Sequence, residues 1–183
     1  MTIYLIRHAQ SKFNAVFDLN RSKDPMIFDA PITELGERQA LDVRDQVAQL
    51  GIKRIIVSPF TRALQTACLI FGETRPFEVH PEVREQVVHS CDVGRPPHEL
   101  AGDFSHLEFS HLENHWWYKG ENDQNGIPVE PDEVLKQRAD AYATTLKSAP
   151  SRPTAIVSHG NFIRALSGIK PGNCEIIEYD PKK

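Results

Sequence analysis

Three short, largely apolar runs, widely separated along the chain, constrain its fold more than any other feature. They span Thr2 to Ile6, Arg54 to Val57 and Thr154 to Val157, and each ends abruptly at polar residues. Short continuous apolar runs are typical of strands buried on both faces of a parallel sheet. Segments with helical periodicity follow them. We therefore expect an α/β fold, a three-layer α/β/α sandwich around a mostly parallel sheet.

Helix signals bound four segments in which apolar residues recur at steps of three and four. Thr33 is the predicted N-cap of a helix that continues to Leu50. The other predicted helices end at Gly72, before Pro150 and at Ser167. These helices are expected to cover the two faces of the sheet.

Two further strands are predicted with weaker patterns. The segment from Phe77 to Gln86 is interrupted by Pro81, which cannot donate a ladder hydrogen bond and therefore indicates an edge strand or a bend. The last strand-like stretch runs from Cys174 to Tyr179. Between them, about residues 88–130 lack periodicity and are rich in Pro, Gly, His, Asp and Asn, so we expect an irregular insertion that caps the active site.

Length and charge exclude several classes of protein. The 183 residues fit one domain, 1–183. A net charge of −4 gives no reason to expect nucleic acid or an anionic membrane as a partner. No apolar run approaches a membrane span and the start lacks a secretory pattern, so a cytoplasmic protein is expected. Cys68, Cys91 and Cys174 form no CxxC pair and are predicted to be free thiols.

Two histidines, His8 and His159, directly follow predicted buried strands, where parallel strands present their carboxyl ends to one crevice. Each histidine alone is weak evidence, because strand ends need polar residues as the chain reaches water. Arg7, Asn14 and Arg62 add cationic and amide donors at the same edge. Arginine suits a phosphoryl group because its planar fork donates two parallel hydrogen bonds.

Backbone donors at helix N-termini complete the outline of an oxyanion pocket. Arg62 lies at the start of one predicted helix, and Gly160 and Asn161 lie at the start of another. We therefore count Gly160 and Asn161, with Asn14, as candidate phosphate-binding residues.

In order and spacing, these residues resemble the histidine phosphatase superfamily, the phosphoglycerate mutase-like proteins. The resemblance covers most of the chain. It is carried by Leu5-Ile6-Arg7-His8-Ala9 with Asn14, Pro31-Ile32-Thr33-Glu34-Leu35-Gly36, Ser58-Pro59-Phe60-Thr61-Arg62-Ala63-Leu64-Gln65-Thr66, Glu85 and Ser158-His159-Gly160.

The resemblance implies a role for each polar residue. His8 would be the nucleophile that becomes a phosphohistidine. Arg7, Arg62 and His159 would hold the phosphoryl oxygens with help from Asn14, and Glu85 would be the proton donor. One departure is Ala9, because the residue after the nucleophile is usually glycine in this family.

Elementary chemistry agrees with these roles. A neutral imidazole attacks phosphorus if its other nitrogen donates to a fixed acceptor, so His8 should be uncharged near neutral pH. Arg7, Arg62 and a protonated His159 would supply the charge that a metal supplies elsewhere, so we expect no metal and no cofactor.

Glu85 would protonate the leaving alkoxide and then take a proton from water, provided that burial raises its pKa. Glu82 is the rival for this role. Alternation along a strand would turn Glu82 and Glu85 to opposite faces, so only one of them should face the pocket. The family pattern favours Glu85.

The insertion offers a second chemistry. Four of its histidines, with nearby Cys91, Asp92 and Asp103, suggest zinc, but their spacing is loose and a solvated segment is the default expectation. The histidines are His98, His106, His111 and His115. Trp116 and Trp117 are expected to pack on the core or over the crevice.

Several residues are candidates to bind the part of a ligand beyond the phosphate. By resemblance, the segment after the acid commonly sets specificity in this family, which makes His89, Asp92, Arg95 and Lys119 candidates. In the loop after the first strand, Arg21 and Lys23 could attract an anion, although a solvated loop is the simpler interpretation.

The predicted function is hydrolysis of a phosphomonoester, a small phosphorylated metabolite, through a phosphohistidine. Three alternatives stay open. They are a phosphoglycerate mutase, for which the chain is short, a noncatalytic module that binds phosphate ligands, and a phosphatase of phosphohistidine proteins.

Overall fold

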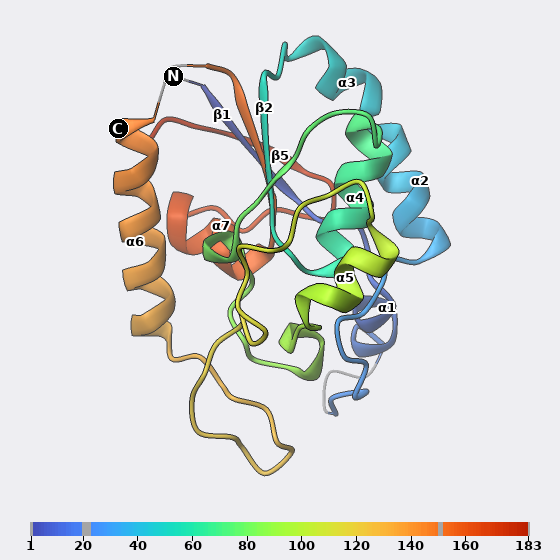
Figure 1. The fold of residues 1–183 in the computed structure, drawn as a ribbon, viewed down its shortest axis with the longest axis vertical. Coiled ribbons are helices and arrows are strands. Elements are labelled where there is room, and N and C mark those ends of the chain that lie inside the picture. Colours follow the sequence, from blue (N-terminus) through green and yellow to red (C-terminus); the bar gives the residue numbers. More distant parts are fainter. Residues whose placement is uncertain (1, 20–22, 150–151, 183) are drawn as a thin grey trace.

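The three apolar runs form the centre of a mixed sheet in the computed structural model, which describes residues 2–19, 23–149 and 152–182 (Figure 1). They become β1 (Ile3–Arg7), β2 (Arg54–Val57) and β4 (Thr154–Ser158). β4 lies between the other two and pairs with both in parallel. The carboxyl ends of all three strands therefore meet at one edge.

The two weaker strands lie at the outside of the sheet, whose order in the described residues is β3-β2-β4-β1-β5. β5 (Ile176–Tyr179) runs antiparallel to β1. β3 (Glu78–Val79) pairs in parallel with β2 and is much shorter than the predicted segment from Phe77 to Gln86. The chain leaves the sheet because Pro81 starts a 3-10 turn, η1 (Pro81–Val83). The predicted edge position is confirmed.

Helices cover both faces of the sheet and form three layers with it (Figure 1). α2 (Glu34–Asp42), α3 (Arg44–Gln49) and α4 (Thr61–Phe71) contribute to one hydrophobic cluster. α6 (Asp132–Ser148) and α7 (Gly160–Ser167) contribute to the other. The predicted α/β sandwich with a mostly parallel sheet is confirmed.

Alternation along the central strands divides their side chains between the two clusters. In β2, Ile55 and Val57 pack with α2–α4, and Ile56 packs with α6 and α7. All three side chains are at most 2% exposed. Each buried side chain of this size contributes about 1.5–3 kcal/mol of stability. Because these side chains enter both clusters, packing on both faces of the sheet holds the strand in place.

Two helices differ from the sequence prediction. Thr33 caps α2 as expected, with its side chain accepting the amide N–H of Gly36, but the helix predicted to Leu50 breaks at Val43 into α2 and α3. A short helix that was not predicted, α1 (Lys12–Phe17), follows β1. Its Ser11 N-cap accepts from the main-chain N–H of Asn14 at 3.1 Å, which fixes where the helix begins.

The insertion of about residues 88–130 is largely irregular, as predicted, with η2 (Ser90–Asp92) and α5 (Pro97–Asp103) as its regular elements in the described chain. Five of its apolar side chains belong to the hydrophobic cluster that α2, α3 and α4 cover, namely Leu100, Phe104, Phe109, Leu112 and Trp116. Trp116 is 6% exposed and its ring meets that of Phe60 edge-on at 4.7 Å between centroids. Its core position agrees with the expectation for the tryptophan pair.

Candidate active site

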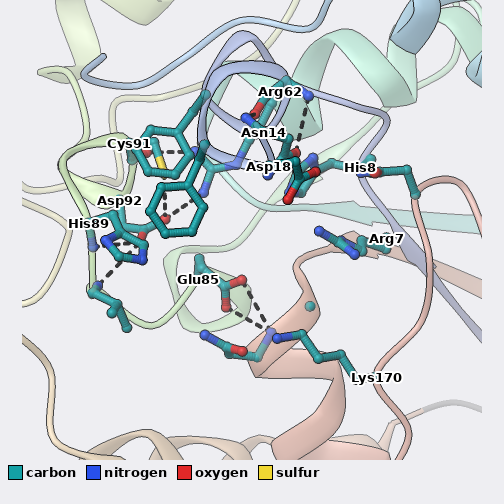
Figure 2. Close-up of a pocket in the computed structure, with 17 residues that line it drawn as sticks. Arg7, His8, Asn14, Asp18, Arg62, Glu85, His89, Cys91, Asp92 and Lys170 are labelled. Atoms are coloured by element: carbon teal, nitrogen blue, oxygen red, sulfur yellow. Dashed lines mark hydrogen bonds and ion pairs between the residues drawn. The ribbon is translucent and has the colours of Figure 1, made fainter. Parts of the chain in front are cut away.

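A cavity of about 480 Å³ opens at the sheet edge where β1 and β4 end (Figure 2). β1 ends at Arg7 and His8, α1 supplies Asn14, the start of α4 supplies Arg62, and the chain after η1 supplies Glu85. Gly160 and Asn161 from α7 also line it. Of the predicted catalytic and phosphate-binding residues, all except His159 reach the cavity wall, and His159 lies behind His8 with a ring-centroid distance of 5.0 Å.

His8 has a defined tautomer. Its Nδ1 lies 2.7 Å from the main-chain oxygen of Ala9, and because a carbonyl only accepts, Nδ1 carries the proton. Burial, followed by the charges of Arg62 and Arg7, holds the pKa of His8 well below its ordinary value. The ring is therefore neutral at physiological pH, and Nε2 keeps a lone pair.

His159 differs from the sequence prediction, which made it protonated. It is fully buried, and burial, followed by the charge of Arg62, holds its pKa well below the ordinary value. Its Nε2 lies 2.7 Å from Ser58 Oγ, whereas Nδ1 has no partner in the described chain. If the Ser58 hydroxyl donates to Nε2, Nδ1 holds the proton and a neutral ring still offers one donor.

Arg62 is held by the start of the insertion. Its Nη1 donates to the main-chain oxygen of Cys91 at 2.6 Å, and its Nη2 pairs with Asp92 Oδ1 at 2.8 Å. Both side chains of this pair are buried, 2% and 6% exposed. The guanidinium also lies 4.5 Å from the centre of the Phe60 ring. Arg62 is thus fixed before any ligand arrives.

Arg7 and Lys170 lie on the other side of the cavity (Figure 2). Arg7 Nη1 donates to the main-chain oxygen of Pro171 at 3.0 Å, while its buried Nε has no partner in the described chain. Both side chains pass close to Gly160, where an added Cβ would lie 3.4 Å from Lys170 Cε and 3.5 Å from Arg7 Nε. These distances are ordinary van der Waals contacts, so Gly160 lies beside both cations.

Glu85 lies in the cavity and Glu82 does not, so the side-chain choice between them agrees with the family pattern. The Glu85 carboxylate accepts the amide N–H groups of Asn161 and Phe162 at 3.1 Å each, at the start of α7. Burial, followed by the charge of Asp92, raises its pKa above the ordinary value. The predicted backbone donors of Asn161 are therefore occupied by Glu85 in this state.

Asn14 and Ala9 support the cavity floor. Asn14 Oδ1 accepts the N–H of Ser11 at 3.2 Å, so the side chain offers a ligand its NH₂ group. Ala9 is fully buried and is not among the described residues with a positive φ. Its N–H donates to Thr66 Oγ1 at 3.0 Å. The departure from glycine at this position therefore causes no backbone strain.

The sequence profile of the histidine phosphatase superfamily (branch 1) matches residues 3–170. The chain belongs to this superfamily. A probable phosphoglycerate mutase, GpmB, of Cronobacter sakazakii is 28% identical over 178 residues, which cover 91% of this chain and 73% of that protein. The protein of the same name from an Enterobacter species is 36% identical over 171 residues, covering 87% and 70%.

Solved structures with similar folds include phosphatases of this kind. A mycobacterial glucosyl-3-phosphoglycerate phosphatase superposes with a TM-score of 0.62 at 20% identity, covering 97% of this chain and 88% of that one. A phosphoserine phosphatase of Entamoeba histolytica, solved with 3-phosphoglyceric acid, gives 0.62 at 21% identity, covering 97% and 89%. At this identity they support the histidine phosphatase fold alone.

Only the first part of the insertion faces the cavity of this member of the histidine phosphatase superfamily. Val88, His89, Cys91 and Asp92 line it. Of the other candidates for ligand contact, Arg95 pairs with Asp29 at 2.9 Å and Asp103 at 2.8 Å, and Lys119 pairs with Glu113. Neither Arg95 nor Lys119 lines the cavity.

The remaining anion-binding candidates and the metal alternative gain no support from the geometry. Lys23 does not line the cavity, and Arg21 lies outside the described residues. Within residues 2–19, 23–149 and 152–182, no group of three or more His, Cys, Asp or Glu side chains is placed to hold a metal ion. His111 instead donates through Nε2 to the main-chain oxygen of Val79 at 2.7 Å. The predicted free thiols are confirmed.

Sequence reasoning missed several cavity residues. Phe13 and Phe17 come from α1, whose i, i+4 pair of rings after a Ser11 cap was an available helix signal. Lys170 and Asn173 follow α7 in a segment without periodicity, and no local pattern points to them.

No described helix is long and apolar enough to cross a membrane.

Proposed function

We propose that this chain hydrolyses a phosphomonoester through a covalent phosphohistidine on His8, with Glu85 as general acid and then general base. The observation that carries the proposal is the 2.7 Å hydrogen bond from His8 Nδ1 to Ala9, which leaves Nε2 unprotonated beside two arginines. Membership of the histidine phosphatase superfamily supports an enzyme acting on phosphate groups.

In the first half-reaction, His8 Nε2 attacks phosphorus and the bond to the ester oxygen breaks. The leaving alkoxide takes a proton from Glu85, whose raised pKa keeps a protonated fraction available. Arg7, Arg62 and the NH₂ group of Asn14 line the cavity and meet the charge on the equatorial oxygens. His159, whose ring lies behind that of His8, adds its Nδ1–H in the tautomer in which the Ser58 hydroxyl donates to Nε2. These donors are already held by the fold, so little reorganisation is needed.

In the second half-reaction, water attacks the phosphohistidine and gives a proton to the Glu85 carboxylate. The phosphorus–nitrogen bond breaks, inorganic phosphate leaves, and His8 returns to the neutral tautomer. Glu85 thus ends each cycle protonated, as it began.

The direct test follows p-nitrophenyl phosphate hydrolysis with and without EDTA, together with trapping of an acid-labile phosphoenzyme. We expect EDTA-resistant turnover and a labile phosphoenzyme, both lost in His8→Ala. His98→Ala is the matched control, because His98 is exposed and lies outside the cavity. A trapped phosphoenzyme that survives His8→Ala would contradict the assignment of the nucleophile.

The role of Glu85 is tested by comparing leaving groups. An alkoxide needs a proton and p-nitrophenolate does not, so in single-turnover measurements Glu85→Gln should slow phosphoenzyme formation from an alkyl phosphate by about 10²–10⁴-fold and from an aryl phosphate much less. Phosphoenzyme formation is measured because hydrolysis of the phosphohistidine also uses Glu85 and is common to both substrates. Glu82→Gln is the control, because Glu82 is exposed and does not line the cavity. Equal losses on both substrates in Glu85→Gln would argue against general acid catalysis.

Two rival functions have distinct signatures. The relatives named as probable phosphoglycerate mutases make mutase activity the second candidate. Interconversion of 2- and 3-phosphoglycerate that depends on added 2,3-bisphosphoglycerate would favour it. Phosphate binding without turnover of any ester would favour a noncatalytic module.

A further inference from the structure

The cavity is larger than its phosphate-binding floor. Its volume of about 480 Å³ falls in the range of about 300–1,000 Å³ typical of pockets for whole small molecules. The donors for a phosphoryl group lie around His8, so the rest of the space must receive the alcohol part of an ester. What lines that space decides which esters fit.

One wall of this space is aromatic. Phe13 and Phe17 stack on each other with centroids 5.3 Å apart, and the ring of His89 lies 5.4 Å from Phe13 and 4.7 Å from Phe17. All three rings line the cavity. Phe13 is buried and supports the other two, which are partly exposed. Figure 2 shows His89 on the side of the cavity away from Arg7 and Lys170.

The aromatic wall is held in place from two directions. The Ser11 cap fixes α1, which carries both phenylalanines. Asp24 fixes the chain beside His89, because its carboxylate accepts both the N–H of Ser90 at 2.8 Å and the Ser90 hydroxyl at 2.6 Å. A flat ligand would therefore meet rings that have already lost their conformational freedom.

We propose that this wall is a subsite for the leaving group, and that the preferred substrates are phosphomonoesters whose alcohol carries an aromatic ring. The ring would stack against Phe17 and His89 while the phosphoryl group lies over His8. This inference rests on the proposed function, since it places the phosphate at the same cavity floor. Offset or edge-to-face ring contacts at this spacing are favourable.

Lys170 supports a different substrate class. It lines the cavity and has no ion pair in the described chain, so it could bind a carboxylate in the alcohol part. Lys170 is exposed, however, and a single exposed cation in water contributes little. Three rings held by two separate segments are the stronger determinant.

The test measures binding to the full chain, so that it does not depend on turnover. Calorimetry would compare 2-phenylethylphosphonate with ethylphosphonate, which share a phosphonate and differ by one ring. We expect the phenyl compound to bind at least about tenfold more tightly, equivalent to about 1.4 kcal/mol. If neither phosphonate binds, the phosphate site fails and the aromatic subsite with it.

Variants locate the preference on the wall. Phe17→Ala should bring the affinity ratio toward one, and Phe17→Leu, which keeps an apolar side chain and guards against misfolding, should lower it in part. Phe28→Ala is the matched control, because Phe28 is 51% exposed and does not line the cavity. A ratio near one in the wild type, a ratio unchanged in both Phe17 variants, or tighter binding of 2-carboxyethylphosphonate would overturn the proposal.

Discussion

Replacing Asp92 by alanine tests how the fold holds Arg62, the arginine that we propose binds phosphate. Asp92 Oδ1 pairs with Arg62 at 2.8 Å, and Oδ2 accepts the N–H groups of Val88 and His89 at 3.2 and 3.1 Å. The variant leaves a buried guanidinium without its counter-charge. Breaking a buried pair from one side costs about 3–5 kcal/mol, so we expect a loss of that size in the free energy of unfolding.

A surface pair provides the matched control. Lys136 and Asp140 pair at 2.7 Å on α6, with side chains 70% and 62% exposed. Exposed pairs at this helical spacing contribute about 0.3–0.5 kcal/mol, so Asp140→Ala should cost roughly a tenth of what Asp92→Ala costs. The two substitutions remove the same group and differ in the burial of the pair.

Urea unfolding followed by tryptophan fluorescence measures both losses, because Trp116 is buried against Phe60. The wild type and variants are compared at neutral pH without phosphate. Added inorganic phosphate should restore part of the stability of Asp92→Ala, because it brings a negative charge to Arg62. If Asp92→Ala lowers the free energy of unfolding by less than about 1 kcal/mol, the reasoning is wrong, because an unpaired buried Arg62 should cost more than that.

Three further changes test other parts of the structure. In the folded protein, the pKa values of His8 and His159 lie well below about 6.5. Below about pH 6.5 the unfolded chain therefore binds more protons than the folded protein does. The free energy of unfolding should then fall with decreasing pH by up to about 1.4 kcal/mol per pH unit for each ring. His8→Asn should therefore flatten the urea-derived stability curve below about pH 6.5, and curves parallel to wild type would contradict this. Gly36→Ala should cost about 1–3 kcal/mol in thermal unfolding, since its Cβ would lie 2.3 Å from a main-chain oxygen, while Gly102→Ala on α5 meets nothing within 4 Å and should be neutral or stabilising. Ala9→Gly should lower the urea-derived stability by about 0.5–1 kcal/mol, because the backbone there needs no left-handed conformation, and a stabilised variant would be the opposite result.

Local patterns predicted most of the sheet and helices. β1, β2 and β4 are readable because strands buried on both faces are apolar throughout. β3 was overestimated, since the apolar pattern continues past Pro81 although the ladder does not. α1 was missed because a six-residue helix depends on its cap and on tertiary packing more than on periodicity.

The structure brings most of the predicted site residues to one cavity, and only some of their contacts were predictable from the sequence. Strand ends brought His8 and Arg7 to one edge, and motif order added Arg62. The pair between Arg62 and Asp92 and the bonds from the start of α7 to Glu85 join residues 30 and 76 positions apart, which no periodicity reveals. The neutral state of His159 likewise follows from its burial.

The attachment of Arg62 to residues 91 and 92 has a consequence for how such a protein can diverge. Positions 88 and 89 line the cavity, so under the proposed function a change of substrate preference would arise most directly there. Their neighbours Cys91 and Asp92 hold Arg62, which the proposed reaction needs for any phosphate ester. New specificities would therefore be gained by changing side chains beside a segment that must keep its contacts to Arg62. They could also be gained by changing Phe13 and Phe17 of α1 in the same wall, because these residues do not hold Arg62.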